Sequence, residues 1–407
     1  MRMGTRTVAV LALVCANGTV ANGQGRTMTL AEVLARAREQ APQIISARLA
    51  LEETRARLAG ASLQLQANPQ IDGAIGNRNG PSGTRFTDFE VGFGQGFEPG
   101  SRRSARIDGA KAAIAQATAG IDDVTRTVLR QSAAAYFRAV HANERIKLLN
   151  AAYDLASNIY SAADRRFKAG DIAVLDVNLA RASLARVRAD REGAEASKAL
   201  ALGELRQLLR LDDSLTVDGP LFSPARADLN AVLESVSNRP ELRALEAGIQ
   251  QAEAELRLGQ SFTKPDYGVG MRYSREEGDH IVLGGMTVSL PFFAKGQEQQ
   301  AAGTARAARL RAELDAARAR VQAEVRASFD AYNRRVAAVQ TLEAEAIPGL
   351  DENERLTTRS FEVGQLGLPE LLLIRREILE TRFQYLDALL EAVLARTDLD
   401  ASAGILQ

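Results

Sequence analysis

Two stretches of the chain, residues 69–97 and 265–291, alternate apolar positions with polar or glycine positions, and each begins at a proline. In the first stretch, Phe89, Val91 and Phe93 would point to one side of an extended chain, and the residues between them to the other. A period of two is typical of strands, so each stretch is predicted to contain two. Their joining segments are polar and rich in turn-forming residues: 77–84 and 274–279. On alternation alone, a soluble hairpin with one hydrated face is an equally good interpretation.

Long segments with almost no glycine or proline occupy most of the remaining chain. The expected helices, in chain order, are 43–67, 101–167, 173–211, 241–262, 297–361 and 368–399. The two longest would each extend about 90–100 Å, with a small interruption near Pro348. Gly170 and Gly364 follow them, at positions where a helix has to stop and reverse. The pattern predicts two long helical hairpins, each interrupted at its far end by a β-hairpin.

The two halves of the chain repeat one ground plan at a nearly constant spacing. The matched segments are 30–34 with 229–233, Asn68-Pro69 with Lys264-Pro265, and 167–170 with 361–364. This duplication predicts a first repeat over residues 22–211, a linker over 212–227 and a second repeat over 228–407. Both repeats are expected to build one intertwined structure.

The first 21 residues are typical of a secretory signal peptide. Arg2 and Arg6 precede a short apolar run, residues 8–16, which is too short to span a bilayer. We expect cleavage after Ala16 or after Ala21, and therefore an exported mature protein.

The single cysteine, Cys15, lies inside this leader. If it is removed with the signal, disulfides, thiol catalysis and cysteine-based metal sites are excluded from the mature chain. A lipoprotein signal would normally have a small residue before the cysteine, whereas Val14 stands there. No later apolar run is long enough for a transmembrane helix, so we expect strands to make any membrane crossing.

Charge and motif content argue against nucleic-acid binding and catalysis. The chain has 51 Lys+Arg and 51 Asp+Glu, without the basic excess that nucleic-acid binding needs. His141 and His280, the only histidines, stand far apart in the pattern and are interpreted as incidental. Hydrolase, phosphate-loop and zinc-protease motifs are absent from the sequence. We therefore expect no catalytic residue, no metal site and no cofactor.

A membrane sheet of four strands has to be completed by other chains. Hydrocarbon offers no partner for backbone amides, so a spanning sheet must close on itself, and bacterial barrels need at least about eight strands. Two chains would supply eight strands and three would supply twelve. Glycine and acidic residues on the inward faces favour a wide, water-filled lumen, and hence three chains. The predicted fold class is mainly α with a membrane β-barrel: a trimeric α-helical tunnel plus a 12-stranded barrel.

Together these features resemble the TolC-type outer-membrane efflux factors. The resemblance covers essentially the whole mature chain and depends on the order and spacing of the duplication, the proline entries to the strands, the Phe-x-x-Gly turns and the exit segment 95–100. The exit segment is most similar to the heavy-metal branch, although Pro99 and Ser101 depart from its usual glycine-rich form. The resemblance implies a homotrimer in outer-membrane lipid with its tunnel in the periplasm, a periplasmic adaptor and an inner-membrane pump as partners, and passive conduction of heavy-metal cations or small toxic compounds.

The resemblance also directs attention to two carboxylates. Asp176 lies six positions after Gly170, and Glu370 lies six after Gly364. In family members the corresponding zone of the second repeat forms the constricted periplasmic entrance, so both residues are candidate gate residues that attract cations. The alternative is that each is an ordinary acid in the first turn of a helix, where the helix dipole favours it.

The turns themselves, Phe167 to Gly170 and Phe361 to Gly364, are the candidate adaptor-docking elements. The two phenylalanines are expected to pack back on their own hairpins, with partial exposure to an adaptor as the alternative.

Two other interpretations remain open. A periplasmic coiled-coil adaptor or scaffold also combines an export signal with long alanine-rich helices, but the duplication favours the channel. The exit duct of a type I protein-secretion system would share the fold, because the pump, not the channel, selects the cargo.

Overall fold

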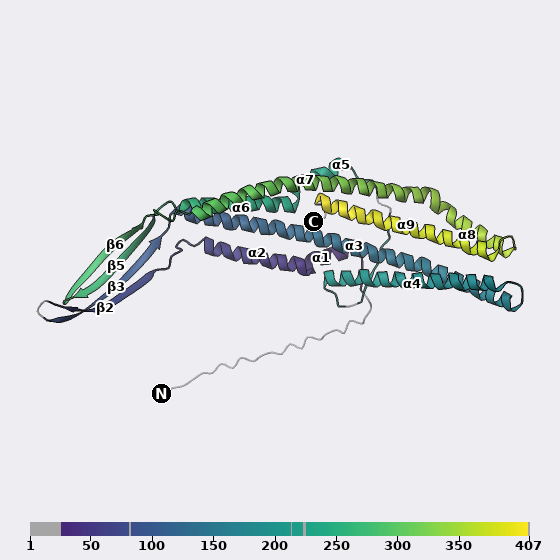
Figure 1. Cartoon of the computed structure of the whole chain (residues 1–407), viewed down its shortest axis with the longest axis horizontal. Coiled ribbons are helices and arrows are strands. Elements are labelled where there is room, and N and C mark those ends of the chain that lie inside the picture. Colours follow the sequence, from purple (N-terminus) through teal and green to yellow (C-terminus); the bar gives the residue numbers. More distant parts are fainter. Residues whose placement is uncertain (1–25, 81–82, 213, 223–224, 406–407) are drawn as a thin grey trace, which may run out of the picture.

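The computed structural model describes residues 26–405 except 81–82, 213 and 223–224, so the expected signal peptide and Cys15 lie outside the described residues. Figure 1 shows a sheet at one end and long helices that run away from it. The sheet is antiparallel with strand order β2-β3-β5-β6. Its strands are β2 (Gln70–Asn79), β3 (Arg85–Phe97), β5 (Asp266–Glu276) and β6 (Asp279–Ser289).

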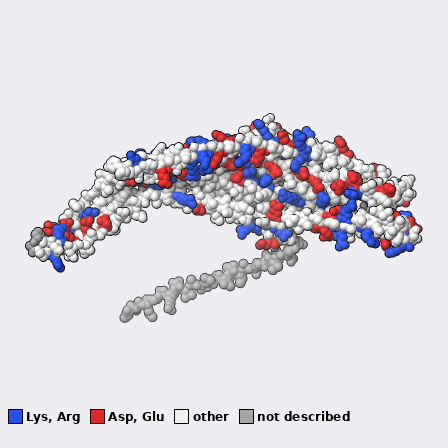
Figure 2. All heavy atoms as spheres, viewed as in Figure 1, with Lys and Arg blue, Asp and Glu red and all other residues white. Residues whose placement is uncertain are grey.

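The register of the sheet confirms the predicted alternation. Ile71 lies opposite Phe93, Phe93 opposite Met271, and Met271 opposite Gly284, so an apolar row crosses all four strands on one face. The opposite face carries most of the glycines and charged residues of the sheet, with Asp72 across from Gly92. The apolar side chains are exposed, Ile71 at 79%. Figure 2 shows a largely uncharged zone between the charged hairpin tips and the charged helices.

The turn of the second β-hairpin is shorter than expected. A loop over residues 274–279 was predicted, but β5 continues to Glu276 and β6 starts at Asp279. Glu277 and Gly278 make the turn, with φ of 52° and 101°. Two residues with positive φ match the twist of paired strands, so the strands can pair right up to the turn. In the first β-hairpin, β2 likewise extends to Asn79.

The long helices agree with the predicted hairpins. The first hairpin pairs α3 (Gly100–Lys168) with α4 (Val174–Leu209), and α3 alone has 69 residues. The second pairs α7 (Gln297–Thr341) and α8 (Ile347–Glu362) with α9 (Leu368–Ala403). The expected interruption is confirmed as a π-helical turn, η2 (Leu342–Ala346), just before Pro348. Proline has no N–H to donate, so the hydrogen-bonding pattern has to change near it.

Shorter helices open each repeat: α1 (Leu30–Gln40) and α2 (Pro42–Ala61) in the first, and α5 (Leu229–Ser235), the 3₁₀ turn η1 (Val236–Asn238) and α6 (Pro240–Ser261) in the second. Thr29 and Glu32 form a capping box at the start of α1. Pro42 and Pro240 start α2 and α6, as expected for a residue whose missing N–H is not needed there. The helix predicted over 43–67 ends at Ala61 instead, because Ser62 takes the C-cap and donates its N–H to Leu58.

A small parallel sheet near the middle of the molecule was not expected. β1 (Arg26–Met28) pairs with β4 (Leu215–Val217), which lies within the predicted linker 212–227. The Thr27 and Thr216 hydroxyl oxygens are 2.8 Å apart across the pair. Three-residue strands have no readable period, so only the tertiary partner stabilises them.

Helix packing depends on small side chains. Ala105, Ala112 and Ala119 of α3 are buried at intervals of seven, as are Ala194 and Ala201 of α4. A seven-residue repeat of buried positions is the seam of a coiled coil, and alanine lets the helices approach closely. Within the described residues, no helix is both long and apolar enough to cross a membrane.

Candidate functional site at the helical tips

Both hairpins reverse through the same backbone motif. Gly170 has φ of 83° and Gly364 has φ of 75°, the left-handed conformation that glycine adopts without strain. In the first turn, the N–H of Gly170 donates to the carbonyl of Phe167, and the N–H of Asp171 donates to that of Arg166. In the second turn, Gly364 donates in the same way to Phe361, and Gln365 to Ser360. Each turn is therefore a Schellman motif that satisfies the last carbonyls of the incoming helix.

The two candidate carboxylates occupy equivalent places in the outgoing helices. Asp176 and Glu370 each stand three residues after the N-cap, Ala173 and Gly367 respectively, and neither cap supplies a side-chain hydrogen bond. A carboxylate there faces the positive end of the helix dipole. Glu370 is exposed and folds back over Gly367, since a Cβ on that glycine would overlap its carboxylate; Asp176 is half-buried. Neither carboxylate forms an ion pair with any described residue.

The tips expose more apolar surface than the two phenylalanines. Phe167 is 41% exposed and Phe361 is half-buried. Sequence reasoning missed four other apolar tip residues, each more than half exposed: Val174, Leu175, Val363 and Leu373. Valine and leucine in and beside a Gly-containing turn, where polar residues are usual, were the available signal.

The histidines are not equivalent. His141 on α3 was interpreted as incidental, but its Nε2 lies 2.7 Å from Asp387 Oδ1 on α9. Arg145 also donates to Asp387, at 3.1 Å, and stacks over the Phe383 ring. The hydrogen bond from His141, opposed in part by burial and assisted by Arg145, lowers the pKa of Asp387. This cluster forms contacts between the first hairpin and the second. Its members are too far apart in sequence for a local sequence pattern to predict the contact.

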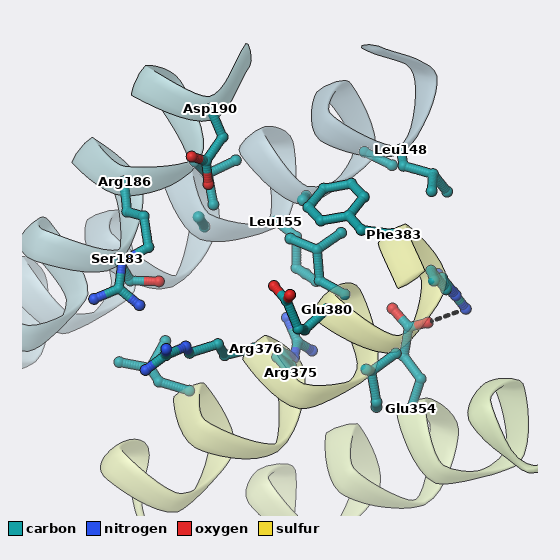
Figure 3. A pocket seen from close by; sticks show the side chains of 18 of the residues that line it. Leu148, Leu155, Ser183, Arg186, Asp190, Glu354, Arg375, Arg376, Glu380 and Phe383 are labelled. Atoms are coloured by element: carbon teal, nitrogen blue, oxygen red, sulfur yellow. Dashed lines mark hydrogen bonds and ion pairs between the residues drawn. The ribbon is translucent and has the colours of Figure 1, made fainter. Parts of the chain in front are cut away.

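Between this cluster and the tips lies a cavity of about 370 Å³, bounded by α3, α4, α8 and α9. Figure 3 shows Arg186 of α4 and Arg376 of α9 reaching toward the same side of it, with Phe383 and Leu155 on an apolar side. Glu354 of α8 bonds Arg382 at 2.8 Å. The described residues contain no group of three potential metal ligands.

At the other end of the molecule, the polar face of the sheet carries ion pairs that cross three strands. Arg272 of β5 lies 2.8 Å from Glu90 of β3 and 4.0 Å from Asp72 of β2. Gly92 makes room for this arrangement, because a Cβ there would overlap the Asp72 carboxylate. The two faces of the sheet thus differ as a membrane-facing surface and a water-facing surface would.

A four-stranded sheet with one exposed apolar face, set on helical hairpins of this length, is the arrangement expected of a tunnel-type outer-membrane channel. An outer membrane efflux protein family model matches residues 33–209. The cobalt-zinc-cadmium resistance protein CzcC of Cupriavidus metallidurans is 26% identical over 319 residues, which cover 76% of this chain and 75% of CzcC. Residues 33–209 are thus similar to the outer membrane efflux protein family, and the two matches support an outer-membrane efflux component with its helices in the periplasm.

Solved structures share the whole fold. The CmeC outer membrane channel of Campylobacter jejuni is similar with a TM-score of 0.75 at 16% identity, over 92% of this chain and 85% of CmeC. The open state of the Neisseria gonorrhoeae MtrE outer membrane channel gives a TM-score of 0.73 at 19% identity, over 92% of this chain and 88% of MtrE. Both the sheet and the long helices therefore belong to the shared architecture.

Proposed function

We propose that three copies of this chain form one continuous channel that passively conducts substrates across the outer membrane. The observation that carries the proposal is the four-stranded sheet: β2 and β6 are its outer strands, and its apolar face is exposed. Exposed backbone edges are not tolerated in hydrocarbon, so β6 of one copy pairs with β2 of the next until twelve strands close the barrel. A ring of this kind joins two different edges, which is how cyclic trimers assemble.

Three copies fit the polar face better than two. An eight-stranded barrel fills its interior with side chains. On the polar face of this sheet, Gly92, Gly94 and Gly270 have no side chain that could fill such an interior. The cluster of Arg272, Glu90 and Asp72 also needs water on that face. Twelve strands provide that space.

The partners proposed for the assembled channel are a periplasmic adaptor and an inner-membrane pump. The exposed apolar residues at both helical tips give an adaptor a surface to bind. The rival role, as a periplasmic adaptor or scaffold itself, is disfavoured because two β-hairpins alternate with two helical hairpins and their four strands form one sheet.

For the cargo we propose heavy-metal cations, on the strength of the exit segment 95–100 and the similarity to a cobalt-zinc-cadmium resistance protein. Conduction requires neither a catalytic step nor a metal-coordinating site in the channel. The exit duct of a protein-secretion system is the second candidate, and growth of a deletion strain on graded cobalt, zinc and cadmium separates the two. Unchanged metal tolerance would contradict the heavy-metal assignment.

At the periplasmic mouth, Asp176 and Glu370 are proposed as gate residues. Three chains would bring six carboxylates to one entrance, where they attract cations and repel one another. Replacing both by alanine is expected to lower the cation preference of the channel in planar-bilayer recordings, since the mouth then loses its fixed negative charge.

The matched control is the pair Glu195→Ala and Glu377→Ala, exposed acids farther from the tips on the same two helices. It is expected to leave the reversal potential in a salt gradient near the wild-type value. Equal reversal potentials for both pairs and the wild type would remove Asp176 and Glu370 from the mouth.

A further inference from the structure

The cavity between the hairpins has an apolar floor. Leu148, Leu155 and Ile159 of α3 line it together with Leu379 and Phe383 of α9, and Leu148, Leu379 and Phe383 belong to one packed apolar cluster. Its volume of about 370 Å³ lies within the range of small-molecule sites. Its lining residues come from both helical hairpins, on α3, α4, α8 and α9.

Two exposed arginines from different hairpins stand at one side of this floor (Figure 3). Arg186 of α4 and Arg376 of α9 form no ion pair or hydrogen bond with any described residue. Asp190 and Glu380 follow them by four residues on the same helices. An arginine placed N-terminal to the acid is the weaker orientation for such a pair. Both guanidinium groups are thus available to an anion.

A third arginine adds positive charge behind them. Arg375 donates from Nη2 to Thr358 Oγ1 at 3.1 Å, while its Nε and Nη1 are buried without a hydrogen-bond partner. Burial lowers the pKa of Arg375, and Glu354 only partly offsets this. Because Glu354 is already bonded to Arg382, the positive charge of Arg375 is poorly compensated.

We propose that this cavity binds an amphipathic organic anion, a carboxylate or sulfonate on an apolar body of about naphthalene size. The anionic head lies between Arg186 and Arg376, and the body lies on the leucine and phenylalanine floor. The site combines an apolar enclosure with converging cations, which together select for both parts of the ligand. Because the two arginines belong to α4 and α9, the bound anion connects the first hairpin to the second.

The test is calorimetric titration of the full-length mature protein in lipid nanodiscs with 2-naphthalenesulfonate. The wild type is expected to bind saturably, and the double variant Arg186→Gln with Arg376→Gln to bind at least about tenfold more weakly, because two charged hydrogen bonds are lost. Both side chains are exposed, so the fold is expected to tolerate the change. Arg188→Gln, an exposed arginine on α4 outside the cavity, serves as the matched control and should bind as the wild type does.

Two further probes separate the contributions to binding. 2-Naphthalenemethanol lacks the charge and inorganic sulfate lacks the apolar body, and each is expected to bind far more weakly than the sulfonate. Absence of saturable binding to the wild type, equal binding by the double variant, or equal binding of either probe would overturn the proposal. The mass of the same sample reports assembly separately, so failure of the channel proposal and failure of the anion site are distinguishable.

Discussion

Replacing Met271 by arginine is expected to prevent stable assembly in the outer membrane. Met271 lies at the middle of β5, 59% exposed, in the apolar row with Phe93 and Gly284. If this face contacts lipid, an arginine near the bilayer centre costs about 2–4 kcal/mol in each chain. The measurement is the amount of oligomer in purified outer membranes, resolved by electrophoresis without heating, and we expect a severe loss.

Leu283→Arg is the matched control for this prediction. Leu283 is opposite Arg272 at nearly the same depth, is 56% exposed, and belongs to the polar face. An arginine there would face water instead of lipid, so the oligomer should persist. Equal losses for the two variants would mean that the faces do not differ in environment, and the membrane assignment of the sheet would have to be abandoned.

The second large effect is expected at Arg239, which is only 2% exposed. Its guanidinium donates to Glu241 at 3.0 Å, to Glu324 at 3.1 Å and to the carbonyl of Ser402 at 2.9 Å. Arg239→Met would leave these acceptors without their buried cation, a change that costs about 3 kcal/mol, the low end for broken buried pairs because Glu324 keeps contact with water. We expect a clear drop in the thermal unfolding temperature of the purified protein.

Arg243→Met distinguishes burial from the mere loss of an ion pair. Arg243 bonds Asp122 at 2.9 Å, but its side chain is 43% exposed. Exposed pairs contribute about 0–1 kcal/mol, so this variant should unfold close to the wild-type temperature. If the two substitutions lowered the unfolding temperature equally, the buried Arg239 cluster would have no special role in joining α6, α7 and the end of α9.

Long-range periodicity made the helical architecture predictable. A run such as 101–167 with few glycines and prolines has no other stable outcome in a compact chain, and α3 indeed spans Gly100–Lys168. Gly170 and Gly364 were predictable as turns because a left-handed residue is needed where such helices reverse. The break near Pro348 followed from the missing N–H, although its π-helical form did not.

Features that depend on distant partners could not be predicted. β4 is stable only because β1 pairs with it, and the His141 to Asp387 contact joins residues from different repeats. The two-residue turn at Glu277 and Gly278 was overlooked because the polar residues beside it also suit a longer loop. The sequence indicated where the candidate tip residues lie along the chain, but not which groups surround them. For example, it did not indicate that the Glu370 side chain folds back over Gly367.

The duplicated halves differ in the continuity of their longest helix. α3 is continuous, whereas its counterpart in the second repeat is divided into α7 and α8 by η2. Between η2 and the helical tips, the cavity lies between the first hairpin and the helices α8 and α9. The hydrogen bonds of His141 and Arg145 to Asp387 connect the two hairpins.

The most direct test of the account is the mass of the complex extracted in mild detergent from the outer-membrane fraction, measured by native mass spectrometry or light scattering. A mass of three mature chains is the predicted result, because four strands per chain require three copies to close twelve. A single-chain species, or recovery of the protein from the periplasmic fraction, would contradict the shared barrel and with it the proposed channel.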